Sequence, residues 1–314
     1  MKALVTGGNG FIGRYIVGEL RQRGYDVVSF DLVSPAKEAE GVEYIIGSVL
    51  DEFALCNCMR GCDVVFHLAA ILGVQRADAQ LLKCMDVNIR GAVNVFRACV
   101  ACDVPHVVAV SSSEVFGDIS RKKISESDHF NPKSGYAISK LAMEQYLYGF
   151  QKDFGLNFHV LRYFNIYGPG QVAEFVVPRF IKKLQAGLAV KVYGDGQQVR
   201  SFCHIKDAAR ASVEVYHQNA AVNQAIHIGN DKEPITVAEL AKLTSELCQV
   251  DREPEYIDFS DSDRKGSREI YYRIPDITKI RNLIDYEPRI NLREGLLDVI
   301  ESNDIPDSWV TPLE

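Results

Sequence analysis

The stretch TGGNGFIG, residues 6–13, constrains the fold of this chain more than any other feature of its sequence. It follows a short apolar run and precedes residues 11–24, where apolar side chains recur at helical spacing. Gly7 permits a tight turn, Gly10 lets the backbone approach a pyrophosphate, and Gly13 allows a helix to pack closely on a strand. The helix N-terminus then faces the anion. The order strand, glycines, helix therefore predicts a dinucleotide-binding turn.

Asp31 ends a second apolar run, residues 26–31, at the distance from Gly13 that such a turn requires. A carboxylate at this place accepts hydrogen bonds from the adenosine ribose and repels a 2′-phosphate. The next basic residue is Lys37. We therefore expect NAD, rather than NADP, as the cofactor.

Short apolar runs alternate with helical segments through the first half of the chain. Helices are expected at 11–24 and near 51–60 and 85–102. Strands are expected at 2–7, 26–31, 42–48, 63–70, 106–113 and 159–168. Strands with little polar alternation indicate a parallel sheet covered on both faces, so the fold class is α/β, a Rossmann-type doubly wound sheet.

The rhythm of the sequence changes after about residue 170, where short strands and helices mix with Gly and Pro. We expect an NAD-binding domain at 1–170, with strand and helix contributions from later segments. Residues 171–314 would form a smaller α/β lobe that binds the substrate. The 314 residues suit one such unit with a smaller lobe.

Composition excludes several classes of protein. A net charge of −7 argues against a nucleic-acid-binding surface, and the longest apolar runs are too short to span a membrane. The N-terminal sequence lacks the pattern of a signal peptide, so a cytoplasmic location is expected. Cys56, Cys58 and Cys62 lack the paired spacing of zinc ligands, so we expect free thiols and no metal.

Tyr136 and Lys140 are four residues apart in YAISK, a spacing that places both side chains on one face of a helix. An ammonium group, reinforced by a nicotinamide cation, can lower the pKa of a phenol and make it a general base. The pair follows the SSS run at 111–113, after the expected fifth strand. This position favours a catalytic role over an exposed helix face.

Several motifs together resemble the extended short-chain dehydrogenase/reductase family, and most closely its NAD-dependent nucleotide-sugar epimerase/dehydratase branch. The resemblance covers nearly the whole chain. The motifs are TGGNGFIG, HLAA (67–70), DVNIRGAVNV (86–95), VSSSEVFGD (110–118), YAISK (136–140), RYFNIYGPGQ (162–171), VYGDGQQVRSFCHIKDAARA (192–211), NQAIHIGN (223–230) and YRIPDITKIRNLIDYEP (272–288).

The resemblance implies roles for individual residues. Tyr136 would be the base, Lys140 would bind the nicotinamide ribose, Ser112 would hold the reacting sugar oxygen, and Glu114 could handle a second proton. Asn88 would brace the active-site backbone. The implied cofactor ligands are Gly7, Gly10, Phe11, Ile12, Gly13, Asp31, Val49, Leu68, Ala69, Ala70, Tyr136 and Lys140. The implied substrate ligands are Ser112, Ser113, Asn165, Arg200 and Arg268.

Two positions depart from the family pattern. Ser48-Val49 replaces an acidic–hydrophobic pair that often holds adenine, so only contacts from the backbone and from Val49 are carried over. The late phosphate-binding arginine has no unambiguous match among Arg264 and Arg268.

The resemblance implies oxidation of a nucleotide-diphosphate sugar to a transient 4-keto sugar with NADH. We favour 4-epimerisation, because RYFNIYGPGQ and the short 171–178 connection are more typical of epimerases. The alternatives are a 4,6-dehydratase or a UDP-glucuronate decarboxylase that uses Glu114, and a keto-sugar oxidoreductase. A non-catalytic NAD(H)-sensing protein is a remote alternative. A homodimer through helices that carry residues 90–102 and 136–150 is also implied.

Overall fold

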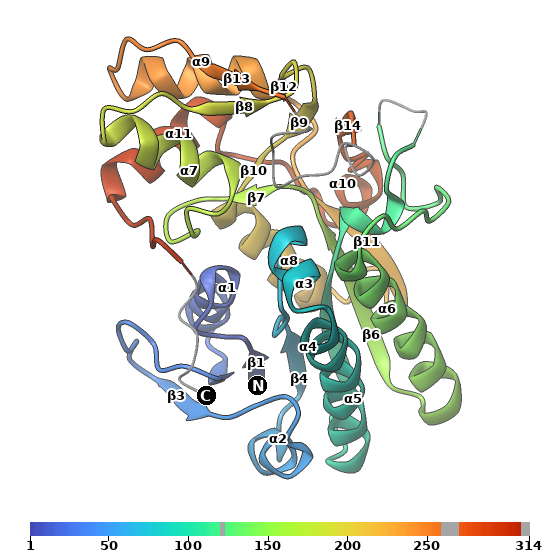
Figure 1. Ribbon diagram of the computed structural model, residues 1–314. Helices are drawn as coiled ribbons and strands as arrows, with labels where there is room; N and C mark the ends of the chain where they lie inside the picture. Colours follow the sequence, from blue (N-terminus) through green and yellow to red (C-terminus); the bar gives the residue numbers. More distant parts are fainter. Residues whose placement is uncertain (120–122, 259–269, 309–314) are drawn as a thin grey trace.

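The computed structural model describes residues 1–119, 123–258 and 270–308. A parallel sheet with helices on both faces forms the larger part of the molecule, and a smaller lobe lies beyond one edge of that sheet (Figure 1). The cofactor and substrate residues expected from the sequence lie along this edge, between the sheet and the lobe.

The main sheet has seven strands, and every neighbouring pair is parallel. Their order is β11-β6-β5-β4-β1-β2-β3, so the chain reverses direction across the sheet between β1 and β4. Ligands of such sheets bind at the carboxyl ends of the strands around this switch point. The strands are β1 Lys2–Thr6, β2 Asp26–Asp31, β3 Val42–Ile46, β4 Val64–His67, β5 His106–Ser112, β6 Asn157–Tyr163 and β11 Gln224–Ile228.

Two hydrophobic clusters lie against the main sheet, and both consist mainly of aliphatic and aromatic side chains. One contains residues of α1 Phe11–Gln22, α8 Ile205–His217 and α10 Thr278–Ile284. The other contains residues of α2 Glu52–Met59, α5 Ala92–Ala101 and α6 Gly135–Phe154. Burial of both faces explains why the strands show little polar alternation.

Short helices α3 Val74–Ala79 and α4 Leu81–Met85 lead into a π-helical segment, Asp86–Gly91, which runs on into α5. A 3₁₀ turn, Ser113–Phe116, follows β5. Both segments carry residues of the site described below.

The smaller lobe has its own hydrophobic cluster, formed largely by α7 Val176–Gln185, α9 Val237–Leu247 and α11 Leu292–Ser302. Capping boxes begin α9 at Thr236 and α11 at Asn291. Its short strands pair as β13-β8, β12-β9-β14 and β10-β7. They are β7 Ile166–Tyr167, β8 Lys191–Tyr193, β9 Val199–Ser201, β10 Cys203–His204, β12 Pro234–Thr236, β13 Glu255–Ile257 and β14 Tyr272–Arg273.

The Rossmann-type fold class predicted from the sequence is confirmed, with two differences in detail. The strand expected at 159–168 ends at Tyr163, because Asn165 has a left-handed backbone (φ 43°), and β7 pairs elsewhere with β10. A seventh strand, β11, comes from residues 224–228 and pairs with β6. This strand was not predicted, because its alternation of polar and apolar residues is short and because residues 224–228 lie within the range assigned to the lobe.

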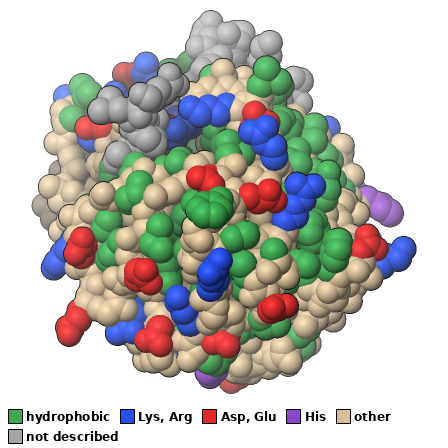
Figure 2. Space-filling model, turned by 90° about the horizontal axis from the view of Figure 1, so that it is seen from below, with side chains coloured by type: hydrophobic (Ala, Val, Ile, Leu, Met, Phe, Trp, Pro, Cys, Tyr) green, Lys and Arg blue, Asp and Glu red, His purple; other side chains and the backbone are tan. Residues whose placement is uncertain are grey.

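The face seen in Figure 2 carries acidic and basic side chains interspersed with apolar ones. None of the helices in the described ranges is both long and apolar enough to cross a membrane. All eight cysteines are free thiols, among them Cys56, Cys58 and Cys62, for which the sequence predicted this state.

Candidate active site

A cavity of about 1220 Å³ lies between the carboxyl edge of the sheet and the lobe. Pockets for one small ligand usually measure ~300–1000 Å³, so this cavity is large enough for two. Nearly all site residues predicted from the sequence line it, while Arg268 lies outside the described residues. Those in the lining are Gly7, Gly10, Phe11, Ile12, Gly13, Asp31, Val49, Leu68, Ala69, Ala70, Ser112, Ser113, Glu114, Tyr136, Lys140, Asn165 and Arg200.

The glycine turn packs so closely against neighbouring backbone that Gly7 and Gly13 have no room for side chains. A Cβ atom on Gly7 would lie 2.9 Å from the Ala69 nitrogen, and the φ of Gly7 is 71°. A Cβ on Gly13 would lie 2.0 Å from the Gly7 carbonyl oxygen. Gly10 occupies the N-cap of α1, whose first amide groups point into the turn. These residues therefore fit a pyrophosphate held by backbone N–H groups.

Asp31 lies at the end of β2 and lines the same cavity. Its carboxylate accepts hydrogen bonds from the backbone N–H groups of Asn9 (3.0 Å) and Val33 (3.4 Å). Burial raises the pKa of Asp31, and these backbone hydrogen bonds oppose the rise. The carboxylate is thus fixed in place beside the glycine turn, as a ribose ligand must be.

Val49 is held from behind by α5 and the π-helical segment. The Asn94 amide donates to the Val49 carbonyl oxygen (3.1 Å), and a Cβ on Gly91 would lie 2.6 Å from the Val49 Cγ2. The side chain of Val49 lines the cavity next to Ser48, so it can contact a flat ring there.

Lys140 and Tyr136 lie in the first turns of α6, whose N-cap Ser134 accepts a hydrogen bond from Ala137 N–H (3.1 Å). The Lys140 ammonium, 2% exposed, donates to the Val110 carbonyl oxygen (2.8 Å). Burial is the main cause that lowers the pKa of Lys140 to about 8. A buried ammonium of this kind loses its proton more easily than a surface lysine does.

The pKa of the Tyr136 phenol lies above its ordinary value. Burial raises its pKa, and the negative charge of Glu114 raises it further, whereas a hydrogen bond with Ser112 lowers it. Nearby positive charge lowers the pKa of a phenol, so bound NAD, whose nicotinamide ring is cationic, would help Tyr136 to act as a base.

Asn88 braces the site backbone, as the sequence suggested. Its amide oxygen accepts from Ile71 N–H (2.8 Å), and its amide nitrogen donates to the Ile71 carbonyl (3.1 Å) and to the Ser139 hydroxyl (3.0 Å). Asn88 belongs to the π-helical segment and Ser139 to α6. The brace therefore fixes the loop after β4 relative to the helix that carries Tyr136.

A buried ion pair lies under the active-site end of β5. Arg162 contacts both carboxylate oxygens of Glu144, at 3.1 Å from Nε and 2.7 Å from Nη2. The Ser111 hydroxyl donates to the same carboxylate (2.5 Å). Both charged side chains are almost completely buried, so each charge requires the opposite charge of the other to offset its desolvation. The pair fixes Ser111 and thereby the position of Ser112.

Glu114 forms an ion pair with Arg273, at 2.7 Å between Oε1 and Nη1. Glu114 comes from the turn after β5 and Arg273 from β14, and both line the cavity. The buried Nε of Arg273 has no hydrogen-bond partner among the described residues. The sequence analysis did not single out Arg273, although it lies in the YRIPDITKIRNLIDYEP stretch.

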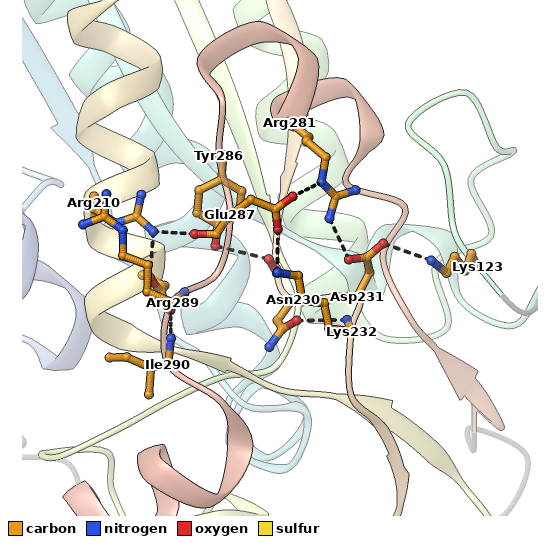
Figure 3. A network of polar contacts seen from close by, with 12 residues as sticks. Lys123, Arg210, Asn230, Asp231, Lys232, Arg281, Tyr286, Glu287, Arg289 and Ile290 are labelled. Carbon is orange, nitrogen blue, oxygen red and sulfur yellow. Dashed lines mark hydrogen bonds and ion pairs between the residues drawn. The ribbon is translucent and has the colours of Figure 1, made fainter.

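Two sets of contacts anchor the segment that carries Arg273. Ile124 forms an isolated β-bridge with this segment. The Ile124 N–H donates to the Ile274 carbonyl (2.8 Å), and the Asp276 N–H donates to the Ile124 carbonyl (2.7 Å). Next to this bridge, Asp231 accepts from Lys123 (2.9 Å) and Arg281 (3.1 Å) (Figure 3). The network therefore joins the loop after β5 to β11 and α10.

The substrate residues predicted in the lobe lie on its side of the cavity. The Asn165 amide donates to the Ser201 carbonyl (3.0 Å), and Arg200 donates to the Val199 carbonyl (3.0 Å). Arg179 and Lys191, which the sequence analysis missed, also line the cavity. Several cations therefore lie where a diphosphate could bind.

A Rossmann turn, an acidic residue at the end of β2 and a Ser–Tyr–Lys set around one cavity define an NAD-dependent enzyme of the short-chain dehydrogenase/reductase type. The chain belongs to the NAD dependent epimerase/dehydratase family, whose model matches residues 3–229. It is an NAD-dependent nucleotide-sugar enzyme.

Curated and solved relatives extend this similarity over almost the whole chain. UDP-N-acetyl-alpha-D-glucosaminuronate decarboxylase of Bacillus cytotoxicus is 31% identical, over 96% of this chain and 97% of its own. UDP-glucose 4-epimerase of Thermotoga maritima, solved with UDP-glucose, has a TM-score of 0.89 at 30% identity, over 96% and 98% of the two chains. MoeE5, solved with UDP-glucuronic acid and NAD, has a TM-score of 0.86 at 32% identity, over 96% and 99%.

We predict that NAD binds much more tightly than NADP, because the Asp31 carboxylate repels a 2′-phosphate. Asp31→Ala should narrow this difference, measured as the ratio of the two Kd values by titration calorimetry. Asp26→Ala, at the exposed start of the same strand, is the control and should leave the ratio unchanged. Equal affinity of the unmodified protein for both cofactors would refute the role of Asp31.

We predict that Tyr136→Phe lowers kcat by ~10²–10⁴-fold, as expected for loss of a general acid–base group, and leaves NAD binding largely intact. The ring and its packing are retained, so the melting temperature should change little. Tyr146→Phe, in the exposed part of α6, is the matched control. Near-normal turnover of Tyr136→Phe would show that another group is the base.

Proposed function

We propose that this enzyme decarboxylates a nucleotide-diphosphate hexuronate through a 4-keto intermediate. The observation that carries the proposal is the Glu114–Arg273 ion pair at 2.7 Å, in the cavity that also contains Tyr136. The sequence favoured 4-epimerisation, with Glu114-dependent decarboxylation as an alternative. The partner of Glu114, which the sequence analysis did not identify, reverses that preference.

A guanidinium in the sugar site suits a substrate that carries a carboxylate. Arginine binds carboxylates through parallel hydrogen bonds, and the Nε of Arg273 is buried without a hydrogen-bond partner among the described residues. Glu114 occupies one side of the guanidinium and fixes its orientation. A substrate carboxylate bound at Arg273 would be repelled by the negative charge of Glu114. This repulsion would be relieved when the carboxylate leaves as neutral carbon dioxide.

The steps follow from the positions of the side chains. Tyr136 accepts the proton of the 4-hydroxyl, whose oxygen Ser112 holds. Bound NAD supplies the oxidation at C4 and the later reduction of the same carbon. The 4-keto hexuronate is a β-keto acid, so the C5–C6 bond breaks, carbon dioxide leaves and the electron pair forms an enolate across C4 and C5. A proton from water added at C5 restores the ketone, and Tyr136 returns its proton to the C4 oxygen during reduction.

The same ion pair argues against a 4,6-dehydratase. That reaction requires a group that protonates the 6-hydroxyl as it leaves. The Oε1 of Glu114 instead forms an ion pair with Arg273, and both side chains are largely buried. The carboxylate is therefore poorly placed to deliver a proton to a leaving hydroxyl.

A second candidate is 4-epimerisation of the same class of substrate. The similarity to a UDP-glucose 4-epimerase, with a TM-score of 0.89, favours it. In that reaction Arg273 would only bind a carboxylate, and the carbon chain of the substrate would stay intact.

We propose that residues 1–170 form the cofactor-binding domain, whose sheet and helical cover are completed by β11 and α8, and that the rest of 171–314 forms the lobe that binds the sugar nucleotide. Asn165 and Arg200 line the lobe side of the cavity, and Arg179 and Lys191 add positive charge there. This charge suits the diphosphate of the substrate, and the name of the decarboxylase relative supports a uridine nucleotide.

We predict that a UDP-hexuronate incubated with the enzyme and NAD yields a product lighter by one carbon dioxide, measured by mass spectrometry. Glu114→Gln and Arg273→Gln should each lower turnover more than tenfold, because each leaves a largely buried charge without its partner. Arg76→Gln, at the cavity wall, is the control for loss of a cation. A product of unchanged mass would establish the epimerase, and loss of water the dehydratase.

We also propose a homodimer through α5 and α6, with α4 alongside (Figure 1). Large apolar side chains are exposed on α4 and α6, among them Leu82 (84%), Ile138 (48%) and Tyr146 (47%). Exposed apolar side chains gathered on neighbouring helices are typical of protein interfaces.

We predict that Leu82→Asp shifts the protein from dimer to monomer, measured by light scattering after gel filtration. Leu188→Asp, at a leucine that is also exposed (50%) but lies in the lobe, should leave the mass unchanged. A monomeric unmodified protein would refute the proposed dimer.

Finally, we propose that the enzyme works in the cytoplasm. All eight cysteines are free, and five of them are buried in the core. A reducing compartment maintains thiols in this state.

A further inference from the structure

Five of the eight cysteines gather where α2 packs against α5. Three come from α2 and the turn after it, the CNCMRGC stretch that the sequence analysis noted, and two come from the end of α5. None of them lines the cavity. They are Cys56, Cys58, Cys62, Cys99 and Cys102.

Three of these thiols are sequestered. Cys58 donates to the Leu55 carbonyl (3.2 Å) and Cys62 to the Cys58 carbonyl (3.6 Å), and both are about 5% exposed. Cys99 is fully buried against the Met59 sulfur, at 3.9 Å. Solvent reagents therefore reach these three side chains poorly.

Cys56 and Cys102 differ from the other three. Both are half-buried, and the Cys102 thiol lies 3.4 Å from the Cys56 carbonyl oxygen. Cys56 belongs to the last turns of α2, and Cys102 caps the C-terminus of α5 outside the regular helix (φ −107°, ψ 13°). A residue at a helix end can adjust its backbone, as disulfide geometry requires.

We propose that Cys56 and Cys102 form a redox-responsive dithiol, which a low-molecular-weight disulfide converts into a cross-link between α2 and α5. The proposal is independent of the proposed function, because neither residue belongs to the cavity.

The reaction is two successive thiol–disulfide exchanges. One thiolate attacks a sulfur of the small disulfide, forms a mixed disulfide and releases one small thiol. The second protein thiolate attacks the protein sulfur of that mixed disulfide and releases the other small thiol. Two S–H groups become one S–S bond, and the small disulfide is reduced to two thiols.

The cross-link would stiffen the part of the molecule that supports Val49. α2 begins three residues after Val49, and α5 holds the Val49 carbonyl through Asn94. The disulfide would also close a long loop, residues 56–102, which reduces the entropy of the unfolded chain.

The test uses the full-length protein treated with glutathione disulfide at about pH 8, because the thiolate is the form that attacks a disulfide. Mass spectrometry should show a protein lighter by two hydrogen atoms, and peptide mapping should join the peptides of Cys56 and Cys102. Cys56→Ser and Cys102→Ser should each abolish this loss of mass. Cys248→Ser, which removes another half-buried cysteine, is the matched control and should leave it intact.

The melting temperature of the oxidised protein should rise by about 5 °C and return after reduction with dithiothreitol. Persistent mixed disulfides with glutathione, no reaction, or a cross-link that maps to other cysteines would each overturn the proposal. A serine variant that fails to fold is replaced by the corresponding alanine variant, judged by the same mass measurement.

Discussion

The parallel arrangement of the seven-stranded sheet is the constraint on which the rest of the structure depends. Because all strands run in one direction, their carboxyl ends meet at a single edge. The turn after β1 supplies the glycines, β2 ends at Asp31, and β5 ends at Ser112. One cavity therefore collects residues that lie far apart in the sequence, and the lobe closes it from the opposite side.

The face of α6 that packs against the sheet carries the Tyr136 phenol into the cavity. Tyr136, Lys140 and Glu144 are spaced four residues apart, so all three face the sheet. The first lies in the cavity, the second donates to a β5 carbonyl, and the third is paired with Arg162 of β6. The Tyr136 phenol is thus placed by the same contacts that fasten the helix to β5 and β6. Any shift of α6 would cost the buried ion pair as well as the site.

The sequence predicted the parts of the site that depend on local spacing. The glycine turn, Asp31 and the Tyr136–Lys140 pair are defined by residues close together in the chain, and the structure brings them to one cavity. Arg273 was missed because its meeting with Glu114 depends on the packing of β14 beside the loop after β5. The break after β6 was missed because only the left-handed backbone of Asn165 reveals it. The predicted ligand Arg268 lies outside the described residues.

The Glu114–Arg273 pair also bears on how such an enzyme can change during evolution. The two side chains are largely buried, so loss of either one leaves an uncompensated charge in a site of low dielectric. A lineage that replaces one of them must pass through a destabilised intermediate or replace both together. Substitutions at these two distant positions are therefore expected to be epistatic, and the two residues to change together.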